Sequence, residues 1–245
     1  MSSNRDEPRI ALVTGGGTGI GAACCRELAA AGLQVGIHYN SSREPAEALS
    51  AEIAGAFLLQ ADLATKEGAD SVYRALKERG GLEVLVNNAG MTVDAPFITA
   101  KLTDFDRVHA VNLRGTWYLT KRLARLMIRK QYGRIINISS VIGSTGNPMQ
   151  SIYGMSKAAI DNLTKTVAAE LAQYNILVNS VAPGFISTRM TADLSAEERD
   201  SIMRLVPLER MGTPAEVARM VRFLAVEGSY CTGAIFHVNG GIYGG

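Results

Sequence analysis

Residues 10–21, I-A-L-V-T-G-G-G-T-G-I-G, decide how the N-terminal part of this chain folds. The four apolar residues Ile10–Val13 are typical of a buried strand, and glycines follow them at once. Small residues over Gly19–Ala31 then predict a helix that Gly32 closes. A strand, a tight glycine turn and a helix that opens directly on the turn indicate the first unit of a parallel α/β sheet.

The rest of the chain repeats this alternation of short apolar runs and longer helical stretches. Further strands are expected at Val35–Tyr39, Ala56–Gln60, Glu83–Val86, Gly133–Ile138, Ile176–Val181 and Ala234–Val238. Helices are expected at Glu44–Ile53, Lys66–Arg79, Thr103–Lys130 (with a break near Asn112–Gly115) and Ser151–Gln173. With right-handed crossovers, the pattern predicts an α/β fold: a single Rossmann-type, doubly wound parallel sheet of about seven strands with helices on both faces.

The 245 residues fit a single α/β domain, which we place at residues 9–245 after a flexible lead at residues 1–8. The pattern loosens between Pro183 and Pro214, and we expect short helices there in a long connection that acts as a lid or binding loop. A net charge of +2 and the lack of a basic tail predict no nucleic-acid partner. Because no apolar run approaches ~20 residues and no secretory signal is present, we expect a cytoplasmic protein without a membrane partner.

The cysteines and histidines show no pattern of disulfides or metal ligands. Two cysteines are adjacent and the third is distant, so we expect them to pack in a reducing compartment. The histidines are scattered, and no metal site is expected. These residues are Cys24, Cys25, Cys231, His38, His109 and His237.

The glycine turn has the residue types that a dinucleotide site needs, although G-x-G-x-x-G does not match it in register. Glycines permit a tight turn, close approach of backbone to a pyrophosphate and close helix–strand packing. The helix that follows would direct free N–H groups and its positive end at the phosphates. The alternative is a glycine turn without a ligand. We expect cofactor contacts from Gly15, Gly17, Thr18, Gly19, Ile20 and Gly21.

A second stretch, from Ser140 to Lys157, carries candidate chemistry. Tyr153 and Lys157 are four residues apart, so a helix that starts near Ser151 places phenol and ammonium on one face. A phenol has a pKa of ~10, and a neighbouring cation is expected to lower it, which makes the tyrosine a usable acid and base. Ser140 is placed to hydrogen-bond a substrate oxygen. Since Y-x-x-x-K pairs also occur by chance, the interpretation depends on the other motifs.

Taken in order, the motifs resemble those of the short-chain dehydrogenase/reductase family, from Ile10 onward. The matching residues are T-G-x-x-x-G-x-G from Thr14, N-N-A-G at Asn87–Gly90, Asn112 in V-N-L, Ser140, Y-x-x-x-K from Tyr153, P-G at Pro183–Gly184 and T-G-x-x-x-x-V-N-G-G at Thr232–Gly241. Each motif alone has low specificity, but their order and spacing together are specific to the family.

The resemblance implies an oxidoreductase with a nicotinamide cofactor and four catalytic residues. Tyr153 would give a proton to the substrate carbonyl, Lys157 would lower the tyrosine pKa and hold the nicotinamide ribose, and Ser140 would orient the substrate oxygen. Asn112 would bend its helix and hold a water of the proton relay; the alternative is an ordinary helical asparagine. Besides Tyr153 and Lys157, the implied cofactor contacts are Asp62, Leu63, Asn88, Ala89, Gly90, Pro183, Gly184, Ile186 and Thr188.

The end of the second strand bears on the choice between NAD and NADP. A carboxylate at this position grips the ribose hydroxyls of NAD and would repel a 2′-phosphate. No acid precedes Glu44 here, whereas Thr18 stands where some NADP-using relatives carry a basic residue. We expect NADP(H), with hydrogen bonds to its phosphate from Asn40, Ser41, Ser42 and Arg43.

Within the family, the stretches G-R-I-I-N-I-S-S-V-I-G, Q-x-x-Y-x-x-x-K and V-N-S-V-A-P-G-F-I-x-T resemble 3-oxoacyl-(acyl-carrier-protein) reductases most. The resemblance implies NADPH-dependent reduction of a 3-oxoacyl thioester to the 3-hydroxyacyl thioester, as in fatty-acid synthesis. The acidic carrier protein would bind Arg125, Arg129 and Lys130, which otherwise form only a solvated helix end. Tyr174 and Val93 replace basic residues of these relatives.

Two other functions stay open at this point. One is a reductase or dehydrogenase of another small ketone, sugar or alcohol on the same scaffold, and the other is a non-catalytic nucleotide-binding regulator. The resemblance also implies a homotetramer in which the long helices at Thr103–Lys130 and Ser151–Gln173 pair across subunits.

Overall fold

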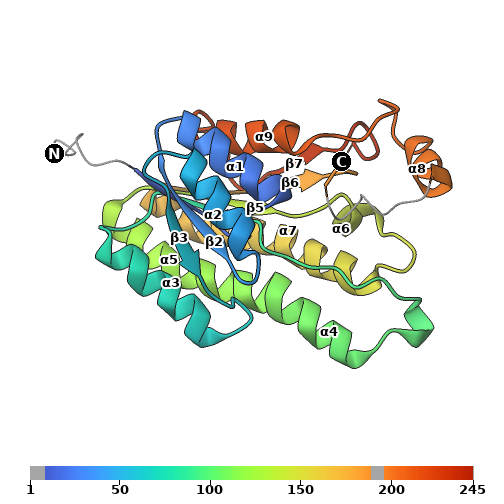
Figure 1. Ribbon diagram of the computed structural model, residues 1–245, viewed down its shortest axis with the longest axis horizontal. Helices are drawn as coiled ribbons and strands as arrows, with labels where there is room; N and C mark the ends of the chain where they lie inside the picture. Colours follow the sequence, from blue (N-terminus) through green and yellow to red (C-terminus); the bar gives the residue numbers. More distant parts are fainter. Residues whose placement is uncertain (1–8, 189–195, 245) are drawn as a thin grey trace.

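A computed structural model describes residues 9–188 and 196–244 (Figure 1). Its parallel strands form one sheet in the order β3-β2-β1-β4-β5-β6-β7. The strands are β1 (Ile10–Val13), β2 (Gln34–Tyr39), β3 (Phe57–Gln60), β4 (Val84–Asn87), β5 (Gly133–Ile138), β6 (Ile176–Pro183) and β7 (Ile235–Val238). The predicted Rossmann-type, doubly wound sheet is therefore confirmed. The predicted lead at residues 1–8 and the part of the long connection at 189–195 lie outside the described residues.

Helices cover both faces of the sheet (Figure 1). One layer consists of α1 (Gly19–Ala30), α2 (Arg43–Glu52) and α9 (Pro214–Val226), and the other of α3 (Lys66–Glu78), α5 (Thr116–Lys130) and α7 (Ser151–Leu171). The shorter elements are η1 (Phe97–Thr99), α4 (Leu102–His109), η2 (Ala110–Gly115), α6 (Ile142–Thr145), η3 (Ala172–Tyr174) and α8 (Ala196–Met203). No helix among the described residues is both long and apolar enough to cross a membrane.

Each face of the sheet has its own apolar core. In β1, Ala11 and Val13 belong to the core under α1, α2 and α9, whereas Ile10 and Leu12 belong to the opposite core. Successive side chains of a strand point to opposite faces, and both faces are covered here. This is why the strand is a continuous apolar run rather than an alternating one.

The chain changes direction in the sheet at β1. β2 and β3 lie on one side of β1, and β4 to β7 lie on the other, so the loops after β1 and β4 diverge. Ligand sites of open α/β sheets form in this crevice, outside the carboxyl ends of the strands. The predicted cofactor and catalytic residues follow the carboxyl ends of these same strands.

The long helical stretch predicted at Thr103–Lys130 is interrupted by η2, a π-helical turn at Ala110–Gly115. The predicted break near Asn112–Gly115 is thus confirmed. At Gly115 the turn packs tightly against the loop after β3, since an added Cβ would lie 2.4 Å from the Leu63 carbonyl oxygen.

The sequence analysis did not predict α9. Its start carries a capping box, in which Thr213 and Glu216 cap each other's backbone N–H groups, and Pro214 occupies the first turn. This signal precedes an apolar run and would have located the helix.

Candidate active site

The glycine turn between β1 and α1 forms a cradle of bare backbone. Gly15 and Gly19 have φ angles of +60° and +53°, which favour glycine. A Cβ added to Gly21 would lie 2.2 Å from the Gly15 carbonyl oxygen, so turn and helix touch through their backbones. In the described part of the chain, the Thr18 side chain makes no capping bond, which leaves the first N–H groups of α1 free for an anion. The turn therefore fits a pyrophosphate.

Asn88 and Thr14 hold this turn against the end of β4. The Asn88 Nδ2 atom donates to the carbonyl oxygens of Thr14 and Gly15 at 2.9 and 3.0 Å. The Thr14 Oγ1 atom accepts the N–H groups of Asn88 and Ala89, both at 2.9 Å. The predicted cofactor residues Asn88 and Ala89 thus also fix the shape of the turn, as does Thr14, which the sequence analysis did not include among the site residues.

His38 is a second residue that the sequence analysis missed. The Gly15 N–H donates to His38 Nδ1 at 3.2 Å, which leaves the proton on Nε2, 3.1 Å from the Ala61 carbonyl oxygen. Burial lowers the His38 pKa to about 4, so the ring is neutral near pH 7. A histidine inside the apolar run of β2 was the available signal. It supports the phosphate cradle and is not a metal ligand in this arrangement.

The other predicted cofactor contacts follow strand ends at the same edge of the sheet. Residues 40–43 follow β2, Asp62 and Leu63 follow β3, and residues 183–188 include the end of β6 and the loop behind it. A Cβ added to Gly19 would lie 3.6 Å from Thr188 Cγ2, so the segment after β6 reaches the glycine turn. The structure thus places the predicted cofactor contacts after β6 next to those of the glycine turn after β1.

Ser140, Tyr153 and Lys157 meet beside the end of β5. The Lys157 Nζ atom lies 5.6 Å from the centre of the Tyr153 ring and donates to the Ile138 carbonyl oxygen at 2.8 Å. The Ser140 hydroxyl accepts the Ile142 N–H at 3.2 Å and lies close enough to the Tyr153 phenol to lower its pKa. Ser140 and Lys157 are only 7% and 6% exposed, so their polar atoms have lost nearly all contact with water.

The environment raises the pKa of Tyr153 instead of lowering it. Burial is the largest cause; the hydrogen bond with Ser140 lowers the pKa, and the charge of Asp94 raises it. The lowering of this pKa by Lys157 stays a prediction. In the protein by itself, desolvation of the phenolate outweighs the contact with Ser140, while the Lys157 ammonium donates to the Ile138 carbonyl oxygen.

The same burial acts on Lys157 in the opposite sense. It lowers the pKa of Lys157 to about 8, and the Asp161 carboxylate raises it. The neutral form of each group is favoured because a low-dielectric site disfavours either charge. Near pH 7, Tyr153 is thus a protonated acid beside a lysine that keeps its charge by a small margin.

Asn112 lies in η2, where the sequence analysis expected it to bend the helix. Its Oδ1 accepts the Met91 N–H at 2.9 Å, and its Nδ2 donates to the Met91 carbonyl oxygen and to Ser156 Oγ at 2.9 and 3.1 Å. Both amide N–H donors are therefore used, so among the side-chain atoms only Oδ1 could accept a hydrogen bond from a relay water. A Cβ on Gly90 would lie 3.3 Å from this Oδ1 and 3.6 Å from Lys157 Nζ, so both atoms border Gly90. The water-holding role stays a prediction.

The predicted basic surface lies at the other end of the sheet. Arg125, Arg129 and Lys130 belong to the later turns of α5, which lead into the amino end of β5. Lys130 forms an ion pair with Glu83, whose second oxygen accepts the Ile10 N–H at 2.6 Å. All three side chains are exposed, but Lys130 is engaged within the chain, whereas Arg125 and Arg129 form no ion pair among the described residues.

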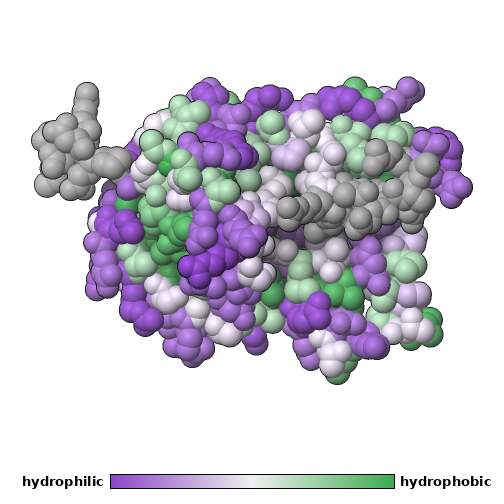
Figure 2. Space-filling view, in the orientation of Figure 1, coloured by the Kyte–Doolittle hydropathy of each residue, from purple (hydrophilic) through white to green (hydrophobic). Residues whose placement is uncertain are grey.

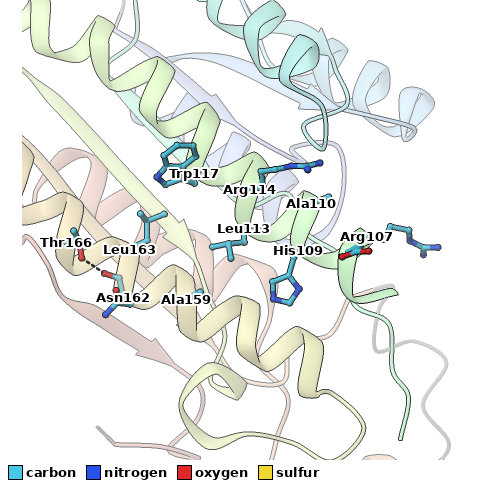
Figure 3. A pocket seen from close by; sticks show the side chains of 11 residues that line it. Arg107, His109, Ala110, Leu113, Arg114, Trp117, Ala159, Asn162, Leu163 and Thr166 are labelled. Atoms are coloured by element: carbon cyan, nitrogen blue, oxygen red, sulfur yellow. Dashed lines mark hydrogen bonds between the residues drawn. The ribbon is translucent and has the colours of Figure 1, made fainter. Parts of the chain in front are cut away.

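A large surface groove, of about 1000 Å³, lies away from the catalytic residues, between α4, η2 and α5 on one side and α7 on the other (Figure 3). Leu113, Trp117 and Leu163 line it, and the Trp117 ring is 45% exposed. On α7 the groove uses the face opposite to Lys157. Apolar residues also reach the surface near η1 and the start of α4 (Figure 2).

Comparisons with known proteins show the family of this chain. A family model described as Enoyl-(Acyl carrier protein) reductase matches residues 15–243. The 3-oxoacyl-(acyl-carrier-protein) reductase of Aquifex aeolicus (strain VF5) is 44% identical over 242 residues, 96% of this chain and 97% of the relative. The chain belongs to the short-chain dehydrogenase/reductase family. It is accordingly an oxidoreductase.

Further relatives of this family cover the chain to a similar extent. The 3-oxoacyl-(acyl-carrier-protein) reductase of Synechocystis sp. (strain ATCC 27184 / PCC 6803 / Kazusa) is 43% identical over 241 residues, 96% of each chain. A crystal structure described as that of a proposed betaketoacyl-ACP reductase has a TM-score of 0.87 at 35% identity, over 96% of this chain and 98% of its own.

We predict that carbonyl reduction declines as the pH rises through about 8, where Lys157 loses its proton. The pH profile of kcat/KM measures this. The folded pKa lies below the unfolded value of ~10.4, so the unfolded chain binds more protons between the two. The free energy of unfolding, relative to a Lys157→Met variant, should therefore rise across this window in urea titrations. A flat kcat/KM between pH 7 and 9.5 (roughly, the span around the Lys157 pKa) would contradict the assignment.

Proposed function

We propose that this protein reduces the ketone of a 3-oxoacyl thioester on acyl carrier protein to the 3-hydroxyacyl thioester, with NADPH, in the cytoplasm. The supporting observation is the trio of buried Ser140, half-buried Tyr153 and buried Lys157 at the sheet edge that also carries the phosphate cradle. Relatives named for this reaction at 40–44% identity support the substrate class. The unpaired cysteines agree with a reducing compartment.

A nicotinamide dinucleotide held at the glycine turn would supply the hydride to the ketone carbon. Burial keeps the Tyr153 phenol protonated, so this group is the acid that gives its proton to the ketone oxygen. The Ser140 hydroxyl orients the same oxygen. The Lys157 charge stabilises the phenolate that forms, because electrostatic stabilisation is strong in a site without water.

We expect residues 143–152, between Ser140 and Tyr153, to form a wall of the substrate pocket, and they are tied to the segment after β4. Gln150 Nε2 donates to both carboxylate oxygens of Asp94, at 3.0 and 3.1 Å. The Ala95 N–H donates to the Met149 carbonyl oxygen at 2.9 Å. Because these bonds join the two loops beside Tyr153, the loops form one continuous border for an acyl chain.

We further propose that the acidic carrier binds Arg125 and Arg129. Lys130 contributes less than the sequence indicates, because Glu83 already neutralises it. The arginines lie at the sheet edge opposite to Tyr153, so a carrier bound there would serve the active site of a neighbouring subunit.

That arrangement needs the homotetramer, in which the groove beside Trp117 would pair with a second copy. The predicted elution volume in gel filtration is that of four chains of 26.1 kDa. Elution at the position of a monomer or dimer would contradict the assembly.

We predict a preference for NADPH over NADH in kcat/KM, and loss of that preference in Arg43→Ala. Arg43 opens α2, and its exposed guanidinium pairs with Glu47 at 2.7 Å. Exposed pairs of this kind are weak, so the guanidinium is available for a 2′-phosphate. Arg26→Ala breaks a similar exposed pair with Glu52 and should change nothing. A native preference for NADH would overturn the assignment.

The substrate class is tested by steady-state assays with NADPH and several thioesters. Acetoacetyl thioesters of acyl carrier protein should be reduced faster than a crotonyl thioester, an enoyl substrate, and faster than a panel of small ketones and sugars. Tyr153→Phe should lose at least about a thousandfold in kcat, with cofactor binding retained. Faster turnover of an enoyl thioester or a sugar would contradict the proposed substrate class. Cofactor binding without turnover of any carbonyl would indicate a regulator.

A further inference from the structure

A second buried charge follows Lys157 on the same face of α7. Asp161 comes four residues later, one helical turn along the axis. Both side chains are 6% exposed. Aspartates are almost never buried to this extent unless they are paired or hydrogen-bonded. None of the roles expected of the four catalytic residues requires a carboxyl at position 161.

A chain of buried hydrogen bonds crosses the sheet beside Asp161. Asn87 Nδ2 donates to Asn137 Oδ1 at 2.8 Å, and Asn137 Nδ2 donates to Thr164 Oγ1 at 2.8 Å. The Thr164 and Ser180 hydroxyls are 2.8 Å apart, and because Thr164 Oγ1 donates to the Ile160 carbonyl oxygen at 2.9 Å, Ser180 donates to Thr164. The polar groups next to Asp161 are thus mostly engaged with one another.

The Asp161 carboxyl is not saturated by hydrogen bonds. Ser139, directly after β5, and Ser180 both lie close enough to lower its pKa, but the Ser139 hydroxyl donates to the Val181 carbonyl oxygen at 3.5 Å. The Asp161 Oδ1 atom is buried without a hydrogen-bond partner of regular geometry among the described residues. Burial raises the pKa of Asp161, whereas the two serine hydroxyls and the charges of His237 and Lys157 lower it. One face of the carboxyl is therefore left to interact with charges at a distance.

Lys157 has no carboxylate within salt-bridge distance in the part of the chain that the structure describes. The negative charge that acts on it is Asp161. The other titratable groups facing this region are Tyr153 on α7, His237 on β7 and Asp94 in the loop after β4. A carboxylate in direct contact would draw the ammonium away from Tyr153. A carboxylate one turn away supplies its field and leaves the ammonium free.

We propose that Asp161 is a positioning residue for the reaction: its buried carboxylate keeps the Lys157 ammonium charged in a dry interior without binding it. The residue acts only through Lys157 and touches neither substrate nor cofactor. The kinetic part of this inference rests on the proposed function, whereas the effect of Asp161 on the charge of Lys157 does not depend on which reaction the protein catalyses.

The test is Asp161→Asn, which keeps the shape of the side chain and removes the charge. The half-titration pH of Lys157, followed by NMR of side-chain-labelled lysine without substrate, should fall by about one unit. The Lys157→Met variant assigns the signal. The alkaline limb of kcat/KM should move by the same amount, which is a loss of about tenfold above the limb, while activity near pH 6.5 (roughly, well below the limb) should remain close to native.

Two control variants separate charge from structure. Thr164→Val removes a hydroxyl from the hydrogen-bond chain without a change of charge, so it should lower stability and leave the Lys157 titration in place. His237→Gln measures the contribution of the histidine. If Asp161→Asn does not fold, Asp161→Ser removes the same charge with a smaller side chain.

An unchanged Lys157 titration in the Asp161 variant would overturn the inference, whatever the activity. A shifted titration with an unmoved kinetic limb would overturn the role in turnover. If the native protein reduces no thioester, the proposed function fails, and the NMR titration still decides the role of Asp161.

Discussion

The removal of water from the carboxyl end of β5 is the constraint on which the rest of this structure depends. Desolvation disfavours the phenolate of Tyr153 and the ammonium of Lys157 together, so it raises one pKa and lowers the other. As a result, Tyr153 is a neutral acid, and the Lys157 ammonium beside it loses its proton more readily than an ordinary lysine. This state suits proton donation to a carbonyl oxygen, because the electrostatic attraction between the lysine charge and the tyrosine oxygen increases as the phenolate forms.

The doubly wound sheet supplies this constraint and the cofactor cradle at one edge. β1 carries the glycine turn, and its neighbour β4 carries Asn88, which fixes the turn through two carbonyl groups. On the other side, neutral His38 ties Gly15 to the end of β3. The turn is thus held from both neighbouring strands before any cofactor binds, which lowers the ordering cost of binding.

Local patterns predicted the sheet and the break at Asn112, because the apolar runs of strands and the helical stretches between them are properties of nearby residues. The residues of the site came mainly from the spacing of the motifs and the resemblance they carry, and their roles stay predictions. The direction of the Tyr153 pKa could not be predicted, since burial depends on the whole fold. The pairing of Lys130 with Glu83 and the hydrogen bonds among Asn137, Thr164 and Ser180 join residues far apart in sequence. The start of α9 was different: its capping box at Thr213 was present in the sequence but was not used.

The central claim is that burial keeps Tyr153 a neutral acid in the folded protein. Ultraviolet difference titration of the native protein against Tyr153→Phe measures this directly, because only the native protein contains this phenol. The account predicts no tyrosinate signal from Tyr153 between about pH 6 and 9, with ionisation above its ordinary value near 10. A tyrosinate that appears in the native protein at neutral pH, and is absent from the variant, would contradict it.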